Sequence, residues 1–483
     1  MSDLPTPDPP SYSHPNTLPN DFDIFIPGDI LPGYSESTSS SPAGSTAVGR
    51  RAPVAAARPP RAPKEFQYKI EAIKGPPIAI LTVLGDGFLS QTIPTFIGGG
   101  PIKGSVRLKA DKADGVQAIV LSLIGRFTSG IEDEQASFLE LSDTLYSQAA
   151  GAPQAHDGSY LWPFELSIPT ELTLPLKKGT EPVRFAPPQT FTERSVLATV
   201  WYELGMKIKR KMLRPDYNER ITTTIGYIPL LRPQSFSPLR SLAYERGTSL
   251  VGPERDREGW HTLDAINMKG PPSTLSADVE IECKLYIAMP LSYTIGTFIP
   301  LALKLTVPTS AQHTLDELLS VPNNITVRLR RSIRPHLPQN KMKAPDNLPL
   351  VNRTEVRDLY EAVWWVRDQS STILQAEGDS KSSNYTRWMD GEIHLGKDTK
   401  PSSKMPYFEI DYTLCFLPFT VPDAKATITK KTPSLQEQTV EVVTSFAPGP
   451  RPVRYAPPGS TSTIVQSERE VFVGFMASRG GFM

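Results

Sequence analysis

Short segments in the middle of the chain alternate apolar and polar residues with a period of two. Phe66, Tyr68 and Ile70, for example, are separated by Gln67 and Lys69. Successive side chains of a β-strand point to opposite faces of a sheet, so this pattern predicts strands with one face in a core and the other in water. Long stretches with the 3.6-residue period of an amphipathic helix are missing from the same region.

Turn residues separate these segments, as at 85–87 (Gly-Asp-Gly) and at 98–101 (Gly-Gly-Gly-Pro). Such breaks end strands and favour hairpins. Two short windows favour helix instead, 132–146 in part and 314–319. We therefore predict an all-β fold, with further strands at 80–84, 105–108, 118–127, 196–208, 221–228, 325–329, 356–366 and 407–417.

The run 285–303 carries no charged residue and is about as long as a bilayer core requires. A transmembrane helix is therefore the alternative to consider. Pro290, Gly296 and Pro300 would interrupt its hydrogen bonding where lipid offers no substitute. The alternation of Ile281 and Cys283 leads straight into this run, so we predict strand, turn and strand.

Changes in composition divide the 483 residues, which suffice for two or three ordinary domains. Pro, Ser, Asp and Gly dominate the beginning of the chain, and Pro, Ser and Thr its end, which is typical of segments that cannot bury a core. We predict a disordered tail over 1–63, a β-sandwich over 64–233, a linker or insertion over 234–273, a second β-sandwich over 274–425 and a mostly disordered tail over 426–483. The linker includes the charge run 254–258, which we expect to be solvated, and the last segment has one strand-like stretch at 440–443.

Composition also narrows the classes of function. The 51 basic and 51 acidic residues cancel, so no overall field favours nucleic acid or an anionic membrane. The two cysteines, Cys283 and Cys415, exclude a disulfide framework and a CxxC zinc module, and they fit a reducing compartment. The six histidines lack the spacing of a metal site, and no nucleophile elbow or dinucleotide fingerprint occurs. We expect no catalytic, metal or cofactor-binding residues, and a β-sandwich enzyme is a remote alternative.

Near the amino terminus, Pro9-Pro10-Ser11-Tyr12 has the Pro-Pro-x-Tyr pattern that WW domains bind. A looser copy follows, in which Leu31 replaces the first proline before Pro32 and Tyr34. Successive prolines hold a polyproline II ridge that fits an aromatic-lined groove with little ordering entropy left to lose. A four-residue match also arises by chance, but two copies in one acidic segment favour a docking tail.

Basic residues gather near the end of the strand predicted at 196–208. If the strand is regular, Lys207, Lys209 and Lys211 share one face, where acidic tails of a partner or anionic lipid head groups would bind. The alternative is a solvated strand face, because lysines often guard sheet edges against aggregation. A second cluster with the same two interpretations contains Arg328, Arg330, Arg331 and Arg334.

Several segments together resemble the arrestins. In the arrestin amino-terminal domain a loop leads into a strand with a Gly-x-Val-x-Leu core, to which Gly104, Val106 and Leu108 are similar, and the next strand ends at a glycine, here Gly125. The segments 161–169 and 196–209 look like later strands of that domain, and 279–307 and 407–417 look like its second sandwich. The likeness covers residues 66–425, and with the Pro-x-Tyr motifs it points to the α-arrestins, or arrestin-related trafficking adaptors.

The resemblance implies two immunoglobulin-type β-sandwiches and a non-enzymatic adaptor in the cytoplasm, at the periphery of the plasma membrane and endosomes. Family members bind WW-domain HECT-type ubiquitin ligases, and their arrestin domains recognise the cytoplasmic tails of membrane transporters or receptors, which are then ubiquitylated, internalised and sorted. Family members often carry their motifs after the arrestin domains, whereas here they come before. The alternative function is an arrestin-fold sorting or coat scaffold that acts without a ligase.

Overall fold

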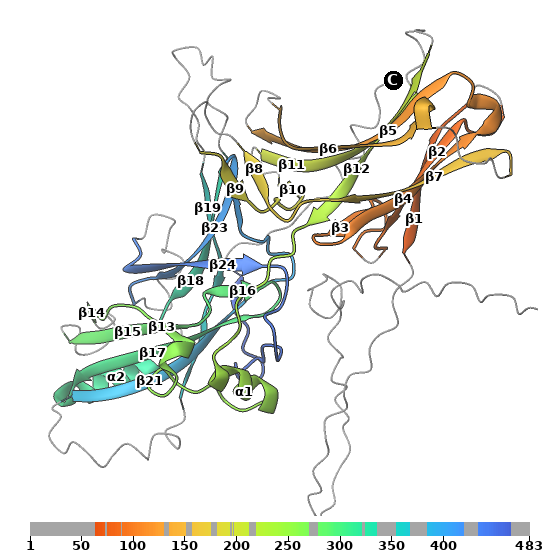
Figure 1. Ribbon diagram of the computed structural model, residues 1–483. Coiled ribbons are helices and arrows are strands. Elements are labelled where there is room, and N and C mark those ends of the chain that lie inside the picture. The colour runs from red at the N-terminus through yellow and green to blue at the C-terminus, as the bar shows by residue number, and fades with distance from the viewer. Residues whose placement is uncertain are drawn as a thin grey trace, which may run out of the picture.

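The computed structural model describes residues 63–464 except 73–74, 88, 130–134, 151–156, 175–180, 194–195, 197, 212–218, 270–278, 321–323, 336–353, 368–383 and 420–432. Within this part the chain forms two β-sandwiches that lie next to each other, the first in red to yellow-green and the second in green to blue (Figure 1). Residues 1–62 of the tail predicted at 1–63, and residues 426–432 and 465–483 of the tail predicted at 426–483, lie outside the described residues.

The first sandwich pairs a four-stranded sheet with a six-stranded one. The order of the smaller sheet is β1-β2-β4-β7, and all its neighbours are antiparallel. In the larger sheet, of order β3-β12-β11-β5-β6, β3 and β12 alone run parallel, and β10 pairs with β11. The strands are β1 (Lys64–Ile70), β2 (Ala79–Gly85), β3 (Thr95–Ile97), β4 (Pro101–Lys109), β5 (Val116–Ser129), β6 (Gln135–Ser147), β7 (Ser159–Ser167), β10 (Phe191–Thr192), β11 (Ala198–Arg210) and β12 (Arg220–Ile228), with a separate ribbon of β8 (Leu172–Leu174) and β9 (Val183–Phe185).

The second sandwich pairs a six-stranded sheet, β13-β15-β17-β21-β20 with β14 on β15, with a seven-stranded one, β16-β24-β23-β18-β19-β25 with β22 on β23. Its strands are β13 (Trp260–Thr262), β14 (Ile266–Lys269), β15 (Glu280–Ala288), β16 (Ser292–Thr294), β17 (Phe298–Pro308), β18 (Val327–Pro335), β19 (Glu355–Glu361), β20 (Val363–Val366), β21 (Asn384–His394), β22 (Ser403–Met405), β23 (Phe408–Phe416), β24 (Gln436–Val443) and β25 (Thr463–Ile464). The two α-helices of the described chain are α1 (Pro238–Arg246) and α2 (Gln312–Ser320), and the 3₁₀ segments are η2 (Ala110–Lys112), η3 (Gln148–Ala150), η4 (Arg257–Gly259) and η5 (Thr309–Ala311).

The alternation seen in the sequence determines which side chains enter the core. Leu81 and Val83 of β2 and Ile281 of β15 are completely buried. Their immediate neighbours within each strand are partly or fully exposed. Burying an apolar side chain of this size contributes about 1.5–3 kcal/mol. The prediction of an all-β fold is confirmed. The helix expected at 314–319 is α2, and the uncharged run 285–303 spans β15, β16 and β17 as strands.

Four details differ from the predictions. The window 132–146, expected to be partly helical, contains β6, because pairing with the long strand β5 outweighs local propensity. The segment 356–366, expected as one strand, is divided at Ala362 between β19 and β20, which belong to different sheets. The linker 234–273 contains α1 and the strands β13 and β14, which pair with β15. The second sandwich extends beyond its predicted end at 425, because β24 lies between β23 and β16.

Candidate interaction surfaces

The predicted WW-binding residues Pro9, Pro10, Tyr12, Leu31, Pro32 and Tyr34 lie outside the described residues. The candidate surfaces that the structure describes are in the two sandwiches. They are the exposed face at the end of β11 and the junction between the sandwiches.

Lys207 and Lys209 lie on the outer face of β11, as the period-two pattern predicts. Both are exposed, whereas Met206 and Ile208 point into the core. Lys211 is also exposed and follows the end of the strand, where the pairing with β5 shifts register. Lys207 does not lie at a sheet edge, because at this residue β11 pairs with β12 on one side and with β5 on the other.

Among the described residues, carboxylates do not balance the charge of Lys207 and Lys209. Lys207 is directly opposite Arg220 of β12, so two like charges are cross-strand neighbours. No carboxylate of the described residues forms an ion pair with Lys207 or Lys209. Arg210 behaves differently, since its Nε lies 2.8 Å from Glu219 and its Nη atoms donate to the carbonyls of Asp114 and Lys112 at 2.7 Å each. The cationic character therefore comes from the lysines and Arg220.

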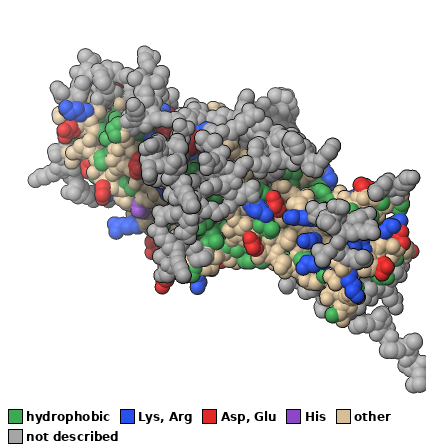
Figure 2. Space-filling model, turned by 90° about the horizontal axis from the view of Figure 1, so that it is seen from above, with side chains coloured by type: hydrophobic (Ala, Val, Ile, Leu, Met, Phe, Trp, Pro, Cys, Tyr) green, Lys and Arg blue, Asp and Glu red, His purple; other side chains and the backbone are tan. Residues whose placement is uncertain are grey.

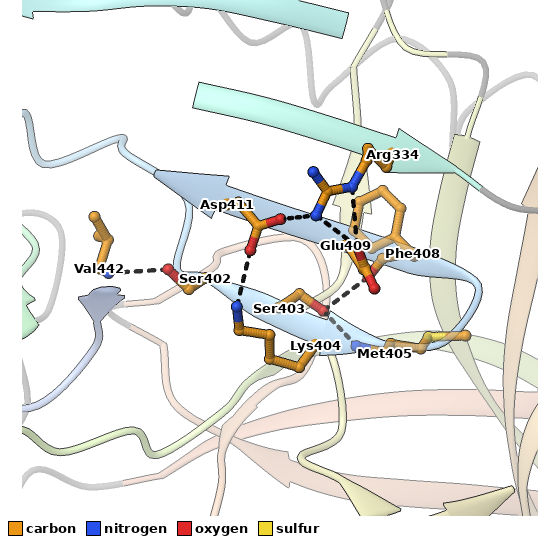
Figure 3. A network of polar contacts seen from close by, with 9 residues as sticks. All are labelled: Arg334, Ser402, Ser403, Lys404, Met405, Phe408, Glu409, Asp411 and Val442. Atoms are coloured by element: carbon orange, nitrogen blue, oxygen red, sulfur yellow. Dashed lines mark hydrogen bonds and ion pairs between the residues drawn. The ribbon is translucent and has the colours of Figure 1, made fainter. Parts of the chain in front are cut away.

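The second basic cluster, in β18, is paired with carboxylates. Arg328 binds Asp358 and Glu361, and Arg330 binds Asp358 at 2.7 Å. Arg334 is held between Glu409 and Asp411 of β23, and Lys404 contacts the other oxygen of Asp411 at 2.9 Å (Figure 3). These arginines connect neighbouring strands, so we do not assign them to a partner surface.

Arg331 differs from its neighbours because it crosses to the first sandwich. Its guanidinium is fully buried and donates to both oxygens of Glu193, Nη1 to Oε1 and Nη2 to Oε2, at 2.8 Å each. Nη2 also lies 3.4 Å from Glu355 of β19. A two-point arginine–carboxylate pair fixes distance and orientation at once, so this contact sets how the sandwiches meet.

Aromatic rings surround this junction. Phe408 of β23 lies 4.7 Å from Phe191 of β10 and 5.9 Å from Phe127 of β5, measured between ring centroids. These three rings are almost completely buried. In Figure 1 the upper ends of β19 and β23 reach the first sandwich beside β8 and β9. The chain that leaves β12 adds hydrogen bonds through the backbone of Leu231. Its N–H donates to the hydroxyl of Thr444 at 2.9 Å, and its carbonyl oxygen accepts from the N–H of Ser445 at 2.8 Å.

The described parts of the face seen in Figure 2 have mixed charge. Basic and acidic side chains are interspersed there. Glu392 is almost fully buried, but it accepts hydrogen bonds from the backbone of Tyr455 and Ala456 and lies 3.3 Å from His394, so its contacts attach a carboxy-terminal segment. Among the described residues, no group of three or more His, Cys, Asp or Glu side chains could hold a metal ion. None of the helices in this part is both long and apolar enough to cross a bilayer.

Neither a family model nor a curated protein matches the chain. The resemblance to arrestins therefore depends on the motifs and the strand pattern given above.

The junction residues were not found from the sequence. Glu193 and Glu355 are single acidic residues in ordinary segments, and nothing in their spacing connects them with Arg331. A partial signal existed for the arginine, because β18 places Leu329, Arg331 and Ile333 on one face, and a charge between two apolar residues of a strand requires a partner.

Proposed function

We propose that this protein is an arrestin-type adaptor without catalytic activity of its own, which brings a WW-domain HECT-type ubiquitin ligase to the cytoplasmic tails of membrane transporters or receptors. In this role the tail with Tyr12 and Tyr34 binds the ligase, and the two sandwiches bind the cargo. The cargo is then ubiquitylated, internalised and sorted. The protein acts in the cytoplasm and at the periphery of the plasma membrane and endosomes.

The observation that carries the proposal is the junction of the two sandwiches. The buried pair of Arg331 and Glu193 and the contact of Phe408 with Phe191 join them into one extended body. Such a body, preceded by Pro-x-Tyr motifs, supports an adaptor, because one part captures the ligase while another presents a broad surface to the cargo.

The exposed lysines of β11 fit the cargo side of this role. Lys207 and Lys209, beside Arg220, would attract acidic segments of a cytoplasmic tail or anionic lipid head groups. The basic face has none of the interleaved aromatic residues on which nucleic-acid bases stack, so we do not propose nucleic acid as a partner.

A titration of the full-length protein against a tandem pair of WW domains tests the ligase contact. Tyr12 and Tyr34 are 22 residues apart in the chain (positions 12 and 34), which corresponds to roughly 26 Å in a flexible segment and would let two neighbouring WW domains bind at once. We expect Tyr12→Ala to remove most of the binding, because it destroys the complete motif. Tyr34→Ala should mainly raise the dissociation rate through lost avidity.

The matched control is Ser11→Ala, at the variable position of the motif, which should leave the affinity unchanged. The double variant of Tyr12 and Tyr34 should lose binding while its thermal unfolding stays the same. An unchanged affinity in the double variant would refute the ligase-adaptor proposal.

Proximity labelling in cells distinguishes the adaptor from a sorting scaffold that acts without a ligase. The wild-type protein should label both a HECT-type ligase and integral membrane proteins. The double tyrosine variant should lose the ligase and keep the membrane proteins. Labelling of membrane proteins without any ligase, by both forms, would favour the scaffold.

A further inference from the structure

A small pocket opens at one end of the first sandwich, away from the junction. It has a volume of about 230 Å³ and lies where β4, η2, β5, β6 and β7 begin or end. Pockets that enclose drug-sized ligands usually measure about 300–1,000 Å³, so this one suits a single side chain or a small ion. Its lining consists of Leu108, Ala110, Ala113, Asp114, Val116, Tyr146, Tyr160 and Trp162.

Three of the lining residues, Tyr146, Tyr160 and Trp162, are aromatic, and their rings are neighbours. The ring centroid of Trp162 lies 5.5 Å from that of Tyr146 and 5.9 Å from that of Tyr160, with interplanar angles of 46° and 30°. Their faces carry the negative part of the ring quadrupole, which attracts a cation. No cation of the described residues lies over any of these three rings.

Asp114 is the one charged residue in the described lining. Its carboxylate is exposed and forms neither a hydrogen bond nor an ion pair with another described residue. Two cations near Asp114 have carboxylate partners elsewhere, because Lys112 contacts Asp111 at 3.9 Å and Arg210 contacts Glu219 at 2.8 Å. The pocket lining therefore combines a carboxylate that has no partner among the described residues with three aromatic rings.

The rim that carries Asp114 is held in place by the rest of the sandwich. Arg210 donates from Nη1 to the carbonyl oxygen of Asp114 at 2.7 Å. The backbone of Val116 bonds to Ala113 at 3.2 Å, and Ala110 bonds to Gly158 at 2.9 Å. A site that is already ordered loses little entropy when a ligand binds.

We propose that this pocket binds the side chain of an arginine in a partner peptide. The planar guanidinium would stack on the rings of Trp162 and Tyr160, which are closer to parallel than to perpendicular, and donate to the carboxylate of Asp114. Lysine fits less well, because its ammonium is a strongly hydrated point charge that does not stack. This site needs neither Tyr12 nor Tyr34, so it stands or falls separately from the ligase contact.

Fluorescence anisotropy with the full-length protein tests the proposal. The probe is a labelled peptide Gly-Ser-Arg-Ser-Gly, and its matched control contains citrulline, which has nearly the shape of arginine without the charge. We expect saturable binding of the arginine peptide and binding weaker by about tenfold for the citrulline peptide. Equal binding of the two peptides, or no saturable binding of the arginine peptide up to about 5 mM, would overturn the site.

Variants locate the bound side chain. Asp114→Asn and Tyr160→Leu should each weaken the arginine peptide by about threefold to tenfold. Asp111→Asn removes a carboxylate from the same loop but outside the lining, and Leu161→Ser changes an exposed side chain of β7, so both should bind like the wild type. Losses of equal size in all four variants would overturn the assignment to this pocket.

Two further probes check the class of cation. Peptides with lysine or trimethyllysine in place of arginine should bind more weakly than the arginine peptide. Tighter binding of trimethyllysine would overturn the arginine assignment and indicate a quaternary ammonium site. The pocket variants Asp114→Asn and Tyr160→Leu should bind WW domains with the affinity of the wild type. This result separates the test of the pocket from the test of the adaptor function.

Discussion

Arg331 of the second sandwich and Glu193 of the first form a two-point ion pair with both N–O distances at 2.8 Å. The arginine side chain is fully buried, and that of Glu193 is 9% exposed. Removing two charges from water is costly, and their close geometry offsets this cost only while both are present. The contact between the sandwiches should therefore be sensitive to the loss of either Arg331 or Glu193.

We predict that Glu193→Gln destabilises the protein by about 2–3 kcal/mol, because a buried guanidinium loses most of its countercharge. Glu355 remains within 3.4 Å and keeps the loss below that of an isolated buried charge. Denaturant unfolding followed by tryptophan fluorescence measures the change. The control is Glu165→Gln, which breaks the exposed pair with Lys103 and should change stability by less than about 0.5 kcal/mol.

A second comparison separates the ion pair from packing. Arg331→Met alone should be strongly destabilising, and adding Glu193→Gln should recover part of the loss, because the unpaired carboxylate is then neutral. Strictly additive effects of the two substitutions would contradict a direct interaction.

Much of the fold could be predicted from the sequence, because the apolar residues that recur with a period of two are the ones that a strand buries. The strands at 118–127 and 407–417 were predicted nearly to their observed ends in β5 and β23. The division of 356–366 at Ala362 was not predicted, since no turn residue in this segment marks where the chain passes from one sheet to the other. Helix α1 was missed although its signals are present, because Ser237 caps its start, Pro238 follows and Gly247 ends it.

The candidate sites were harder to predict than the strands. The common face of Lys207 and Lys209 follows from strand periodicity alone, and the structure has it. The pairing of Arg331 with Glu193 spans 138 residues, and only the tertiary arrangement brings the two together. The charge run at 254–258 was expected to be solvated, yet Asp256 is 6% exposed, because it accepts hydrogen bonds from Ser237 and from the backbone of Gly259.

Glu392 should hold the carboxy-terminal segment onto the second sandwich. Its carboxylate accepts from the backbone N–H groups of Tyr455 at 2.7 Å and Ala456 at 3.2 Å. Glu392→Gln turns one acceptor oxygen into a donor, so one of these partly buried N–H groups loses its partner, at a cost of about 1–3 kcal/mol.

Limited trypsin digestion measures the effect, because Arg454 is exposed and lies just before this contact. Cleavage after Arg454 should be several-fold faster in Glu392→Gln than in the wild type. Glu441→Gln, an exposed position on β24, is the control and should be cleaved at the wild-type rate. Equal rates in all three proteins would contradict the attachment.

The basic face of β11 should bind anionic vesicles. Each lysine near such a surface contributes about 1 kcal/mol, so Lys207→Ala with Lys209→Ala should lower the partition coefficient by more than about tenfold. Co-sedimentation with phosphatidylserine vesicles measures it. Lys103→Ala, in the other sheet, should have no effect, and added salt should weaken the wild type. If the wild-type protein does not bind such vesicles, these lysines do not contact lipid.

Stability should fall in alkaline solution because buried groups resist ionisation. Burial raises the pKa of Tyr227 from 10.0 to about 12. Burial also raises the pKa of the Cys415 thiol from 9.0 to about 12, while nearby Arg330 lowers it. Since the folded state keeps these protons more tightly than the unfolded state, the stabilisation is complete below the unfolded pKa values and is lost as pH rises from about 9 to 12.

The variant Tyr227→Phe isolates one of these contributions. At pH 11 the wild-type tyrosine should account for about 1 kcal/mol of lost stability relative to pH 8, because the unfolded phenol is mostly ionised and the folded one is not. The ring of Tyr227 packs 5.0 Å from that of Tyr202, a contact that phenylalanine retains. The difference in unfolding free energy between wild type and variant, measured by denaturant titration at pH 8 and pH 11, should therefore shift in favour of the variant. A difference that does not change with pH would show that Tyr227 ionises as easily in the folded protein as in the unfolded chain.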